Sequence, residues 1–507
     1  MTGRRTGRRR GAAAAAPARQ VDYHNLRNPF PPAPAFPDDR VAAIHDAALQ
    51  VLEELGIKIL LPEARQLFAQ AGARVEDDMV FIGRDIVEAT LATAPRSFTL
   101  RAGTRKHDIL LELGRVIFLP GGGAPNVSDL IGGRRPGSLQ DFQNLTRIAA
   151  TFEALQTAPG LIEPQDIPVH LRHYATMRTV LNSSDKVPFT YARGTGQVMD
   201  CFEMMRDFRG LSDDEFRAAP HQYTIINTNS PRMIDVPMAQ GLIDFARFGQ
   251  MAVVTPFTLM GAMAPITVAG ALTLSHAEAL AGIALSQLAR PGAPVAYGTF
   301  TSNVDMKSGA PAMGTPEQVK ASLGAGQLAR LLGLPWRCAA GSAANINDAQ
   351  AAHETEISGW GALLAGATII VHSAGWLESG LTVSYEKLIT DMEMVQVMAE
   401  LCADTPASDD DIALDALREV PPGGHFFGAA HTMARYKTEF YEPLAADWSN
   451  FGTWTEHGAI DANTRATGIW QRILHEFQPP DADPDRLAAL DDFIARRTAE
   501  GGAPPES

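Results

Sequence analysis

The chain has 507 residues, 45% of them hydrophobic and 20% charged, which is the composition of a globular enzyme with a large core. Its 43 basic and 58 acidic residues leave a formal net charge of -15, so we expect no nucleic-acid partner. The three cysteines lie far apart and no apolar run approaches the ~20 residues that cross a bilayer, so we expect a cytoplasmic protein without disulfides, a metal site or a membrane segment.

The first 37 residues predict little regular structure. Residues 1–20 hold arginines and a run of only five alanines, which is too short for the apolar part of a secretory signal. Residues 28–37 are rich in proline. We therefore predict a disordered basic tail followed by an extended segment over residues 1–37.

Residues 38–112 predict a small α+β region. Apolar residues recur at helical spacing over 39–55 and stop at Gly56, a residue type that commonly ends helices. Two shorter helices are expected at 64–71 and 84–94. Strand candidates begin at Ile59, Val80 and Ser97.

Between Val116 and Gly375 the sequence repeats one pattern, a short strand-like run followed by a turn and an amphipathic helix. The eight runs are VIFL at Val116, ALQTAPG at Ala154, VPFTYAR at Val187, YTIINTNS at Tyr223, VVTPFTLM at Val253, PVAYGTF at Pro294, PWRCAAG at Pro335 and TIIVHSAG at Thr368. They predict an α/β fold, a (β/α)8 or TIM barrel over residues 113–403, in which sites collect at the carboxyl ends of the strands. Residues 404–507 predict a helical C-terminal region.

The stretch 345–386 is the richest in polar residues at strand-to-helix junctions. Asp348 stands where a helix begins, and Gln350, His353 and Glu354 share one face of its first turns. We interpret Asp348, His353 and Glu354 as candidate catalytic residues and Gln350 as a candidate substrate contact. The alternative is a capping aspartate and a solvated helix face.

Other candidates follow neighbouring strand runs. The predicted substrate contacts outside the helix are Asn229, Tyr297, Phe300, Asn303, Trp376 and Glu378. Aromatic rings near a barrel mouth can face a quaternary ammonium, which offers no strong hydrogen-bond donor. For each ring core packing is the alternative, and for the asparagines it is an ordinary turn. His372 is either a hydrogen-bonded core histidine or a ligand.

Two segments resemble the trimethylamine methyltransferase (MttB-like) superfamily. One combines DAQAAHE at residues 348–354 with LLAGATIIVHSAGWLESGLTVSYEKLITDMEM at 363–394, and the other begins GGHFFGAAHT at 423–432. RNPF at 27–30 and IHDAALQVLEELGI at 44–57 also match. The resemblance implies a TIM barrel that moves a methyl group from a methylated amine to the Co(I) corrinoid of a separate corrinoid-binding protein. The chain itself is then expected to bind no cofactor tightly.

The resemblance also bears on the methyl donor. Trimethylamine-using members carry pyrrolysine in the barrel, and this sequence has no such residue, so it resembles the glycine betaine branch. A quaternary ammonium leaves as a neutral amine, so its nitrogen needs no protonation before a strong nucleophile attacks. We expect acidic Asp348 or Glu354 near the cationic head, and His353, with Asn229 or Gln350, orienting the carboxylate or a water.

Several alternatives remain open from the sequence. The donor can instead be trimethylamine, carnitine, choline or proline betaine, and a protein that binds quaternary amines without turnover is a rival of another class. Lyase or aldol chemistry would require a lysine at a strand end, and the eight runs contain none. A homo-oligomer is possible.

Overall fold

The computed structural model describes residues 23–158 and 160–506, so the predicted basic tail, residues 1–20, lies outside the described residues. The segment from Tyr23 to Pro37 contains no helix and lies along the outer helices. The amide Nδ2 of Asn28 donates to the carbonyl of Leu363, and the backbone amides of Ala35 and Phe36 both donate to Oε1 of Gln327.

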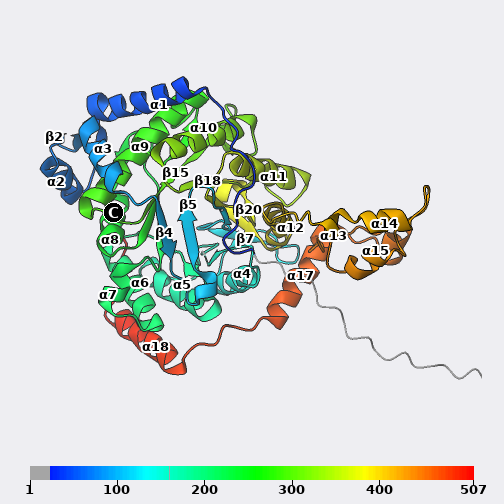
Figure 1. Ribbon diagram of the computed structural model, residues 1–507. Helices are drawn as coiled ribbons and strands as arrows, with labels where there is room; N and C mark the ends of the chain where they lie inside the picture. Colours follow the sequence, from blue (N-terminus) through cyan, green and yellow to red (C-terminus); the bar gives the residue numbers. More distant parts are fainter. Residues whose placement is uncertain (1–22, 159, 507) are drawn as a thin grey trace, which may run out of the picture.

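A curled parallel sheet occupies the middle of the molecule (Figure 1). Its six strands run in the order β11, β13, β15, β18, β19, β6, and β9 pairs with β10 in a separate parallel pair. Single parallel bridges join Phe118 to Leu155 and Phe189 to Tyr223, on either side of that pair. The strands are β6 (Ile117–Phe118), β9 (Thr157–Ala158), β10 (Val187–Pro188), β11 (Tyr223–Ile226), β13 (Met251–Val254), β15 (Val295–Gly298), β18 (Trp336–Ala339) and β19 (Ile369–Val371). Each predicted run contains or overlaps one of them, which confirms an α/β fold with parallel strands.

A helix follows every one of these strands, as the repeating pattern predicts. The helices are α4 (Leu139–Thr151), α5 (Val169–Ser183), α6 (Thr195–Arg209), α7 (Asp213–Ala218), α8 (Val236–Arg247), α9 (Val268–Ala289), α10 (Pro316–Leu332), α11 (Ala349–Leu364) and α12 (Tyr385–Leu401). They surround the strands in Figure 1. Several begin at side-chain caps, for example Ser138, whose hydroxyl accepts from the backbone amide of Asp141 while that carboxylate accepts from the amide of Ser138.

Helix α9 departs from the expectation that no apolar segment is long enough to cross a membrane. It has 22 residues and a mean hydropathy of 1.4, which meets that requirement by length and composition. However, 72% of its apolar window is buried inside the protein, where α9 packs against α1, α3 and α8. An apolar surface on all sides is what a helix buried in a large core requires.

Short strands and turns extend the sheet beyond the carboxyl ends of the parallel strands. They are β7 (Asn126–Ser128), β8 (Arg135–Pro136), β12 (Met233–Ile234), β14 (Phe257–Met260), β16 (Phe300–Val304), β17 (Pro311–Ala312), β20 (Trp376–Leu377), the turn η3 (Glu378–Gly380) and β21 (Thr382–Ser384). β14 pairs in parallel with β16, and β20, β21, β7 and β8 form one small sheet. These elements build the walls of a mouth at this end.

The N-terminal region packs on one side and at the amino ends of the strands. It consists of α1 (Asp38–Gln50), the π-helical turn η1 (Val51–Leu55), β1 (Ile57–Ile59), α2 (Pro62–Gln70), β2 (Arg74–Glu76), β3 (Met79–Phe81), α3 (Arg84–Thr93), β4 (Ser97–Leu100), η2 (Arg105–His107) and β5 (Ile109–Glu112). The predicted helices and strands of this region are all present. Leu100, Ile109 and Leu111 of the β4–β5 hairpin pack into one buried cluster with Ile117 and Met251, the first apolar residues of two parallel strands. The hairpin thereby closes the amino end.

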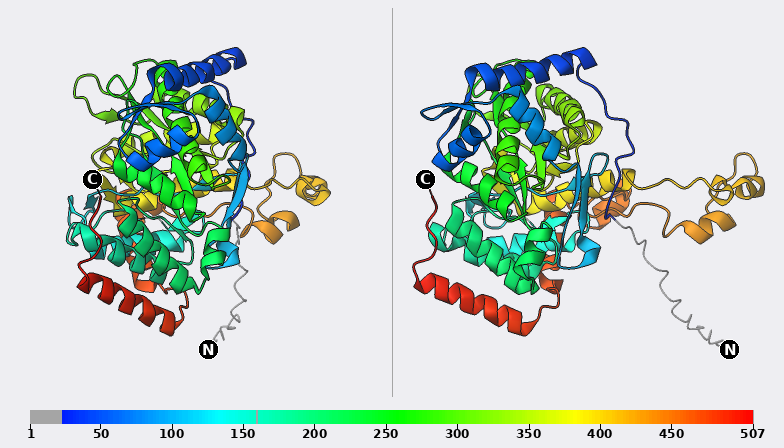
Figure 2. Two further views of the ribbon diagram at one scale, coloured as in Figure 1. Left: turned by 90° about the vertical axis from the view of Figure 1, so that its left-hand side faces the viewer. Right: turned by 60° about the vertical axis from the view of Figure 1, so that its left-hand side comes forward.

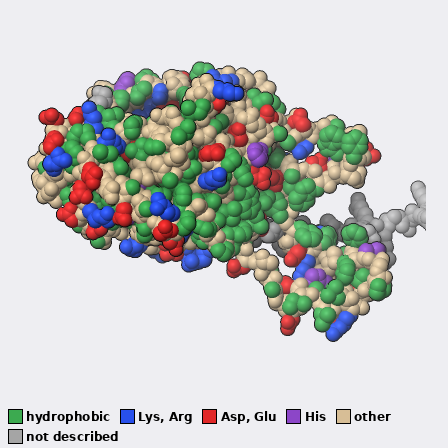
Figure 3. Space-filling model, turned by 90° about the horizontal axis from the view of Figure 1, so that it is seen from above, with side chains coloured by type: hydrophobic (Ala, Val, Ile, Leu, Met, Phe, Trp, Pro, Cys, Tyr) green, Lys and Arg blue, Asp and Glu red, His purple; other side chains and the backbone are tan. Residues whose placement is uncertain are grey.

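The C-terminal region is helical, as predicted. Its helices are α13 (Asp409–Ile412), α14 (Leu414–Glu419), α15 (Ala430–Arg435), α16 (Phe451–Glu456), α17 (Ala462–Glu476) and α18 (Pro484–Ala499). Helix α17 packs on α12 and α4, and α18 packs on α6 and α5. Residues 404–461, which we name the arm, project away from the body (Figures 2 and 3).

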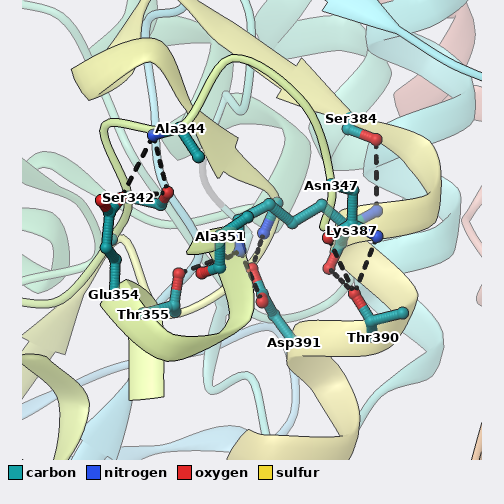
Figure 4. A network of polar contacts seen from close by, with 12 residues as sticks. Ser342, Ala344, Asn347, Ala351, Glu354, Thr355, Ser384, Lys387, Thr390 and Asp391 are labelled. Carbon is teal, nitrogen blue, oxygen red and sulfur yellow. Dashed lines mark hydrogen bonds and ion pairs between the residues drawn. The ribbon is translucent and has the colours of Figure 1, made fainter. Parts of the chain in front are cut away.

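A buried ion pair fixes α12 against its neighbours (Figure 4). The ammonium of Lys387, which has no exposed surface, donates to Asp391 Oδ1 at 2.9 Å, to Thr355 Oγ1 at 2.9 Å and to the carbonyl of Ala351 at 3.2 Å. Asp391 Oδ2 accepts from the backbone amide of Gly375 at 2.9 Å. One cation therefore ties α11, α12 and the loop after β19 together.

Replacing Lys387 by methionine is expected to lower the free energy of unfolding by about 3–5 kcal/mol, because it leaves the Asp391 carboxylate buried without its cation. Urea unfolding followed by circular dichroism measures this. The double variant Lys387→Met/Asp391→Leu should recover most of the loss. Arg418→Met, which removes the exposed Arg418–Asp415 pair, is the matched control and should cost less than about 1 kcal/mol. If Lys387→Met and Arg418→Met lower the free energy of unfolding equally, the buried Lys387–Asp391 pair does not hold the fold together as described.

A second network holds the turn of the β4–β5 hairpin. His107 Nδ1 lies 2.8 Å from Asp185 Oδ1 and its Nε2 lies 3.2 Å from Glu153 Oε2, which His24 also approaches. Hydrogen bonds to Asp185 and then Glu153 raise the pKa of His107 to about 9. Burial alone would raise the pKa of Asp185, but the bonds from His107 and Thr104 lower it to about 2.

This network predicts a pH-dependent stability. Because the pKa of His107 is higher in the folded protein than in the unfolded chain, the protonated ring stabilises the fold. This stabilisation is complete below the pKa of about 6.5 in the unfolded chain and is lost as the pH rises through 9. His107→Gln should therefore lower the urea midpoint most at pH 6, and the difference from the parent protein should shrink by pH 9.5. A difference that stays constant from pH 6 to pH 9.5 would show that His107 does not act through its charge.

Candidate active site

A cavity of about 390 Å³ opens at the carboxyl ends of the parallel strands. Its lining residues come from five of these strands and the segments just after them, β6, β10, β11, β18 and β19, and from neighbouring short elements and helix α8. They are Pro120, Gly122, Phe189, Tyr191, Ala192, Arg193, Tyr223, Ile225, Asn227, Met238, Phe257, Phe300, Arg337, Val371, His372, Trp376, Ser379, Gly380 and Leu381. The volume suits a small molecule, and the end of the sheet is where such folds place their sites.

Arg337 on β18 is the dominant charge in the cavity wall. Its side chain is buried, and its Nη1 donates to the carbonyl of Thr299 at 3.1 Å. Its Nη2 lies 3.0 Å from Nε2 of His372, while its Nε has no partner in the described part of the chain. Burial lowers the pKa of Arg337 to about 10, which leaves the guanidinium charged at neutral pH. None of the residues lining the cavity carries a carboxyl group.

His372 presents a hydrogen-bond donor to the cavity wall. Burial, and then the charge of Arg337, hold the pKa of His372 well below its usual value, so the ring is neutral. Because Arg337 donates to Nε2, the ring proton resides on Nδ1. The backbone of His372 has a φ of 63°, a left-handed conformation that is uncommon for a residue with a side chain. Such backbone conformations cluster at functional sites.

The side-chain N–H groups of His372 and Trp376 both lie close to Gly121, which has no side chain. The rings of His372 and Trp376 stack at 3.8 Å with an interplanar angle of 8°. Nδ1 of His372 and Nε1 of Trp376 are both buried and lack an acceptor among the described residues. A Cβ on Gly121 would lie 3.2 Å from the first nitrogen and 3.1 Å from the second. That Cβ would also lie 2.6 Å from Cδ1 of Trp376, so a glycine is needed for the backbone to approach the two rings this closely.

Aromatic rings form much of the remaining wall. Phe257 and Phe300 lie 4.7 Å apart between ring centroids, and Phe300 meets Trp376 edge-on at 5.9 Å. On the opposite strands Phe189 packs edge-on against Tyr191 at 4.6 Å and against Tyr223 at 5.4 Å. The cavity therefore has two different ends. One carries the charge of Arg337 and hydrogen-bond donors, and the other is lined by aromatic ring faces, which attract a cation.

Of the ten site residues predicted from the sequence, Phe300 and Trp376 line this cavity. The other eight lie elsewhere. His372, which the sequence left between a core residue and a ligand, is part of the wall.

The four polar residues around the start of α11 hold a loop or face solvent. Asp348 caps α11, accepting from the amides of Gln350 and Ala351. Glu354 Oε2 accepts from the hydroxyl of Ser342 at 2.7 Å and from two backbone amides of the β18–α11 loop (Figure 4). Gln350 donates to Glu354, and His353 is exposed on α11. These contacts are those expected of a capped helix and an anchored loop, and the catalytic roles of Asp348, His353 and Glu354 stay predictions.

The remaining four predicted residues also have other partners. Asn229 bridges to Asp235 at the start of α8, and Asn303 accepts from Thr315 Oγ1 at 2.6 Å. Tyr297 is fully buried and its hydroxyl lies 3.1 Å from His276 on α9, behind the sheet. Glu378 forms a two-bond ion pair with Arg134 at the mouth, at 2.8 and 2.9 Å.

Sequence reasoning missed Arg337, Tyr191 and Gly121. A signal for Arg337 was present, because one charged residue interrupts the apolar run PWRCAAG. A charge inside a buried strand is rare unless it is paired or functional. Gly121 stands in the glycine triplet after the first strand, where a tight turn was the preferred interpretation.

Comparisons with known proteins agree on one family. The family model described as Trimethylamine methyltransferase (MTTB) matches residues 2–502. A glycine betaine methyltransferase of Desulfitobacterium hafniense (strain Y51) is 34% identical over 92% of this chain and 97% of its own length. The trimethylamine methyltransferase MttB of Desulfitobacterium hafniense (strain DSM 10664 / DCB-2) is 31% identical over 92% of this chain and 94% of its length. Among solved structures, monomethylamine methyltransferase (MtmB) of Methanosarcina barkeri aligns with a TM-score of 0.50 at 11% identity, covering 91% of this chain and 89% of that one, which shows a shared fold.

Proposed function

The chain belongs to the trimethylamine methyltransferase family, and on that premise we propose that it demethylates a quaternary amine that carries a carboxylate, of the glycine betaine kind. The methyl group passes to the Co(I) corrinoid of a separate corrinoid-binding protein. One observation carries the choice of donor: a buried guanidinium without a carboxylate partner shares its cavity with a wall of aromatic rings.

The two ends of the cavity match the two ends of such a substrate. The carboxylate accepts from Arg337 and from the N–H groups of His372 and Trp376 above Gly121, three donors that otherwise lack acceptors. The methylated ammonium, which cannot donate a strong hydrogen bond, lies against the faces of the surrounding rings. An amine without a carboxylate would leave the donors unsatisfied, at a cost of roughly 1–3 kcal/mol for each buried group.

The protonation states in the cavity favour a quaternary donor. When the C–N bond of a quaternary ammonium breaks, its electron pair stays on nitrogen and the product is a neutral amine. No general acid is needed. The ionisable groups of the cavity are weak acids at neutral pH: His372 is neutral with a lowered pKa, and burial raises the pKa of Tyr191 and Tyr223. A neutral tertiary amine, by contrast, would have to gain a proton before it could lose a methyl group.

The mouth suits a docked acceptor protein. Loops beyond the strand ends carry exposed apolar side chains, namely Leu130, Ile131, Ile266, Met306, Ile346 and Leu381. Leu381 also lines the cavity. Exposed apolar groups around a cavity are typical of protein contact sites. A corrinoid in its Co(I) state supplies the nucleophile when its carrier protein covers this mouth, and the residues of this chain hold the donor and exclude water.

We also propose the finer architecture and the roles of the earlier candidates. The single bridges at Phe118 and Phe189 close the eight strands into a (β/α)8 barrel over residues 113–403, between the region 38–112 and the helical region 404–507. Asp348 and Glu354 act by holding the β18–α11 loop, and His353 belongs to the surface that the carrier protein meets. The protein works in the cytoplasm.

The reaction can be tested with purified protein, a reduced corrinoid-binding protein and glycine betaine. The absorbance of Co(I) should disappear and dimethylglycine should form in equal amount. Choline, which has the same ammonium without a carboxylate, should react at least about tenfold more slowly, because the donors around Gly121 stay unsatisfied. Tight binding of glycine betaine without loss of the Co(I) absorbance would instead favour a binding protein. No reaction with any carboxylated quaternary amine would refute the proposal.

The carboxylate contact makes a separate prediction. Arg337→Met should raise the KM for glycine betaine by roughly 10- to 100-fold, the effect of losing a charge-assisted hydrogen bond of about 1.5–3 kcal/mol, and should change the KM for choline little. Steady-state rates with both substrates measure this split, and Arg337→Lys, which keeps the charge, is the matched control. Gly121→Ala should act in the same direction, because its Cβ would lie 2.6 Å from Cδ1 of Trp376. Equal losses with choline would mean that Arg337 supports the fold and not the carboxylate.

A further inference from the structure

Three side chains from distant parts of the chain bring metal-binding atoms together at the amino end of the sheet. Nε2 of His24 and Nε2 of His107 lie 3.1 and 3.2 Å from Oε2 of Glu153. The ligand atoms of all three residues lie within 4.8 Å of one another. His24 precedes α1, His107 ends η2 in the turn of the β4–β5 hairpin, and Glu153 follows α4. This cluster is separate from the cavity, which opens at the carboxyl ends of the strands.

The donor set and its spacing suit a tetrahedral zinc ion. Two imidazoles and one carboxylate are the protein ligands of a common class of zinc site, in which the fourth position stays open. Metal–ligand bonds of about 2.0–2.1 Å place the ligand atoms of a tetrahedron about 3.3–3.4 Å apart. The separations of 3.1 and 3.2 Å are close to that value. Hydrogen bonds alone also give such separations, so the neighbouring groups decide between the two.

A carboxylate on the far nitrogen of His107 orients its ring as in metal sites. Asp185 Oδ1 lies 2.8 Å from Nδ1 of His107, the nitrogen that does not face Glu153. Asp185 is itself held, because its Oδ2 accepts from the hydroxyl of Thr104 and its carbonyl accepts from the amide of Gly103, both at 2.6 Å. Histidines that bind metals almost always donate their other N–H to such a group, which directs the second nitrogen at the ion.

The backbone beside His24 is fixed, although this residue lies near the start of the described chain. Nε2 of the buried Gln156 donates to the carbonyl of Tyr23 at 3.0 Å, and the carbonyl of Leu26 accepts from the amide of Val116 at 3.1 Å. The side chain of His24 is 10% exposed. A ligand that is already ordered loses little conformational freedom when an ion binds, so this segment is prepared for binding.

The carboxylate of Glu153 can serve two cations at once. Lys106 Nζ lies 3.1 Å from its Oε1, whereas both histidines meet its Oε2. An ion on Oε2 therefore leaves Lys106 in place. Glu153 also lines a cavity of about 410 Å³ together with Tyr441 and Glu442 of the arm. This cavity provides an entry path and room for a water molecule as the fourth ligand.

We propose that His24, His107 and Glu153 bind one zinc ion, with Asp185 orienting the ring of His107. The ion takes the place of the protons that the two imidazoles share with Glu153. It fastens the N-terminal segment to the β4–β5 hairpin and to the loop after α4, and no step of the proposed methyl transfer passes through it. The three ligands have no local spacing, so the sequence, in which only the cysteines were considered, predicted no metal site.

The test uses the full-length protein without an affinity tag, freed of metal with a chelator and titrated with zinc sulfate. Calorimetry should show one zinc ion per chain with a dissociation constant in the micromolar range or below. The thermal midpoint should rise, because the ion binds the folded chain better than the unfolded chain. X-ray absorption at the zinc edge should show nitrogen and oxygen ligands at about 2.0–2.1 Å. A protein that binds no zinc, or that binds it through sulfur, would overturn the proposal.

Variants identify the ligands. His24→Ala and Glu153→Gln should each lower the zinc affinity more than about 100-fold, and Asp185→Asn, which removes an orienting group, should lower it roughly 10- to 100-fold. His475→Ala, which changes an exposed histidine of α17, is the matched control and should leave the affinity unchanged. Circular dichroism shows whether each variant is folded. A folded His24→Ala/Glu153→Gln variant that binds zinc as tightly as the parent protein would also overturn the proposal.

Discussion

A guanidinium buried at the end of a strand without a carboxylate partner is the constraint around which the site is arranged. Removing a charge from water costs several kcal/mol unless hydrogen bonds replace the lost hydration. Arg337 donates two such bonds, to the carbonyl of Thr299 and to Nε2 of His372. The second bond decides the tautomer of His372, which places the Nδ1–H donor beside the Trp376 ring and the backbone of Gly121. The charge that remains unbalanced is then available to an anionic ligand. In this way one residue sets the polarity of the whole cavity, and the aromatic walls determine what can occupy its other end.

The scaffold keeps these groups in place through contacts far from the ligand. The Lys387–Asp391 pair holds the backbone of Gly375, next to Trp376, and the same ammonium binds the first turns of α11. Glu354 fastens the loop between β18 and α11 to that helix. A stacked pair of rings gains from such support, because a small shift of either ring would move a donor out of reach. The polar residues of α11 therefore contribute to the site by fixing its frame.

Much of the fold could be predicted from the sequence, because most of the parallel strands lie in runs rich in β-branched or aromatic residues that are followed by a turn and a helix. β9, which is only Thr157–Ala158, is the weakest of these runs. The candidate site was harder to predict from the sequence. Phe300 and Trp376 line the cavity, because aromatic residues just beyond a strand end face the mouth. Asp348 and Glu354 were assigned to chemistry because a polar residue at a helix start looks the same whether it caps the helix or contacts a ligand. Tyr297 differs from Phe300 only in the direction of its side chain, and that direction depends on packing against α9, which no local pattern reveals. Arg337 was passed over inside an apolar run, although a lone charge there is itself a signal.

The seal at the amino end of the sheet has a kinetic consequence. Leu100, Ile109 and Leu111 of the β4–β5 hairpin fill that end. Under the proposed function, the methyl donor, the demethylated product and the docking carrier protein therefore all use the mouth at the carboxyl ends of the strands. On that proposal, the methyl donor must enter the cavity before the carrier protein docks. The product amine then leaves the cavity after the carrier protein has departed. Turnover should accordingly follow a compulsory order, with the product competing against the donor for the free protein. An excess of reduced carrier protein would slow turnover, because a carrier docked over the mouth stops the donor from entering an empty cavity and the product from leaving a filled one.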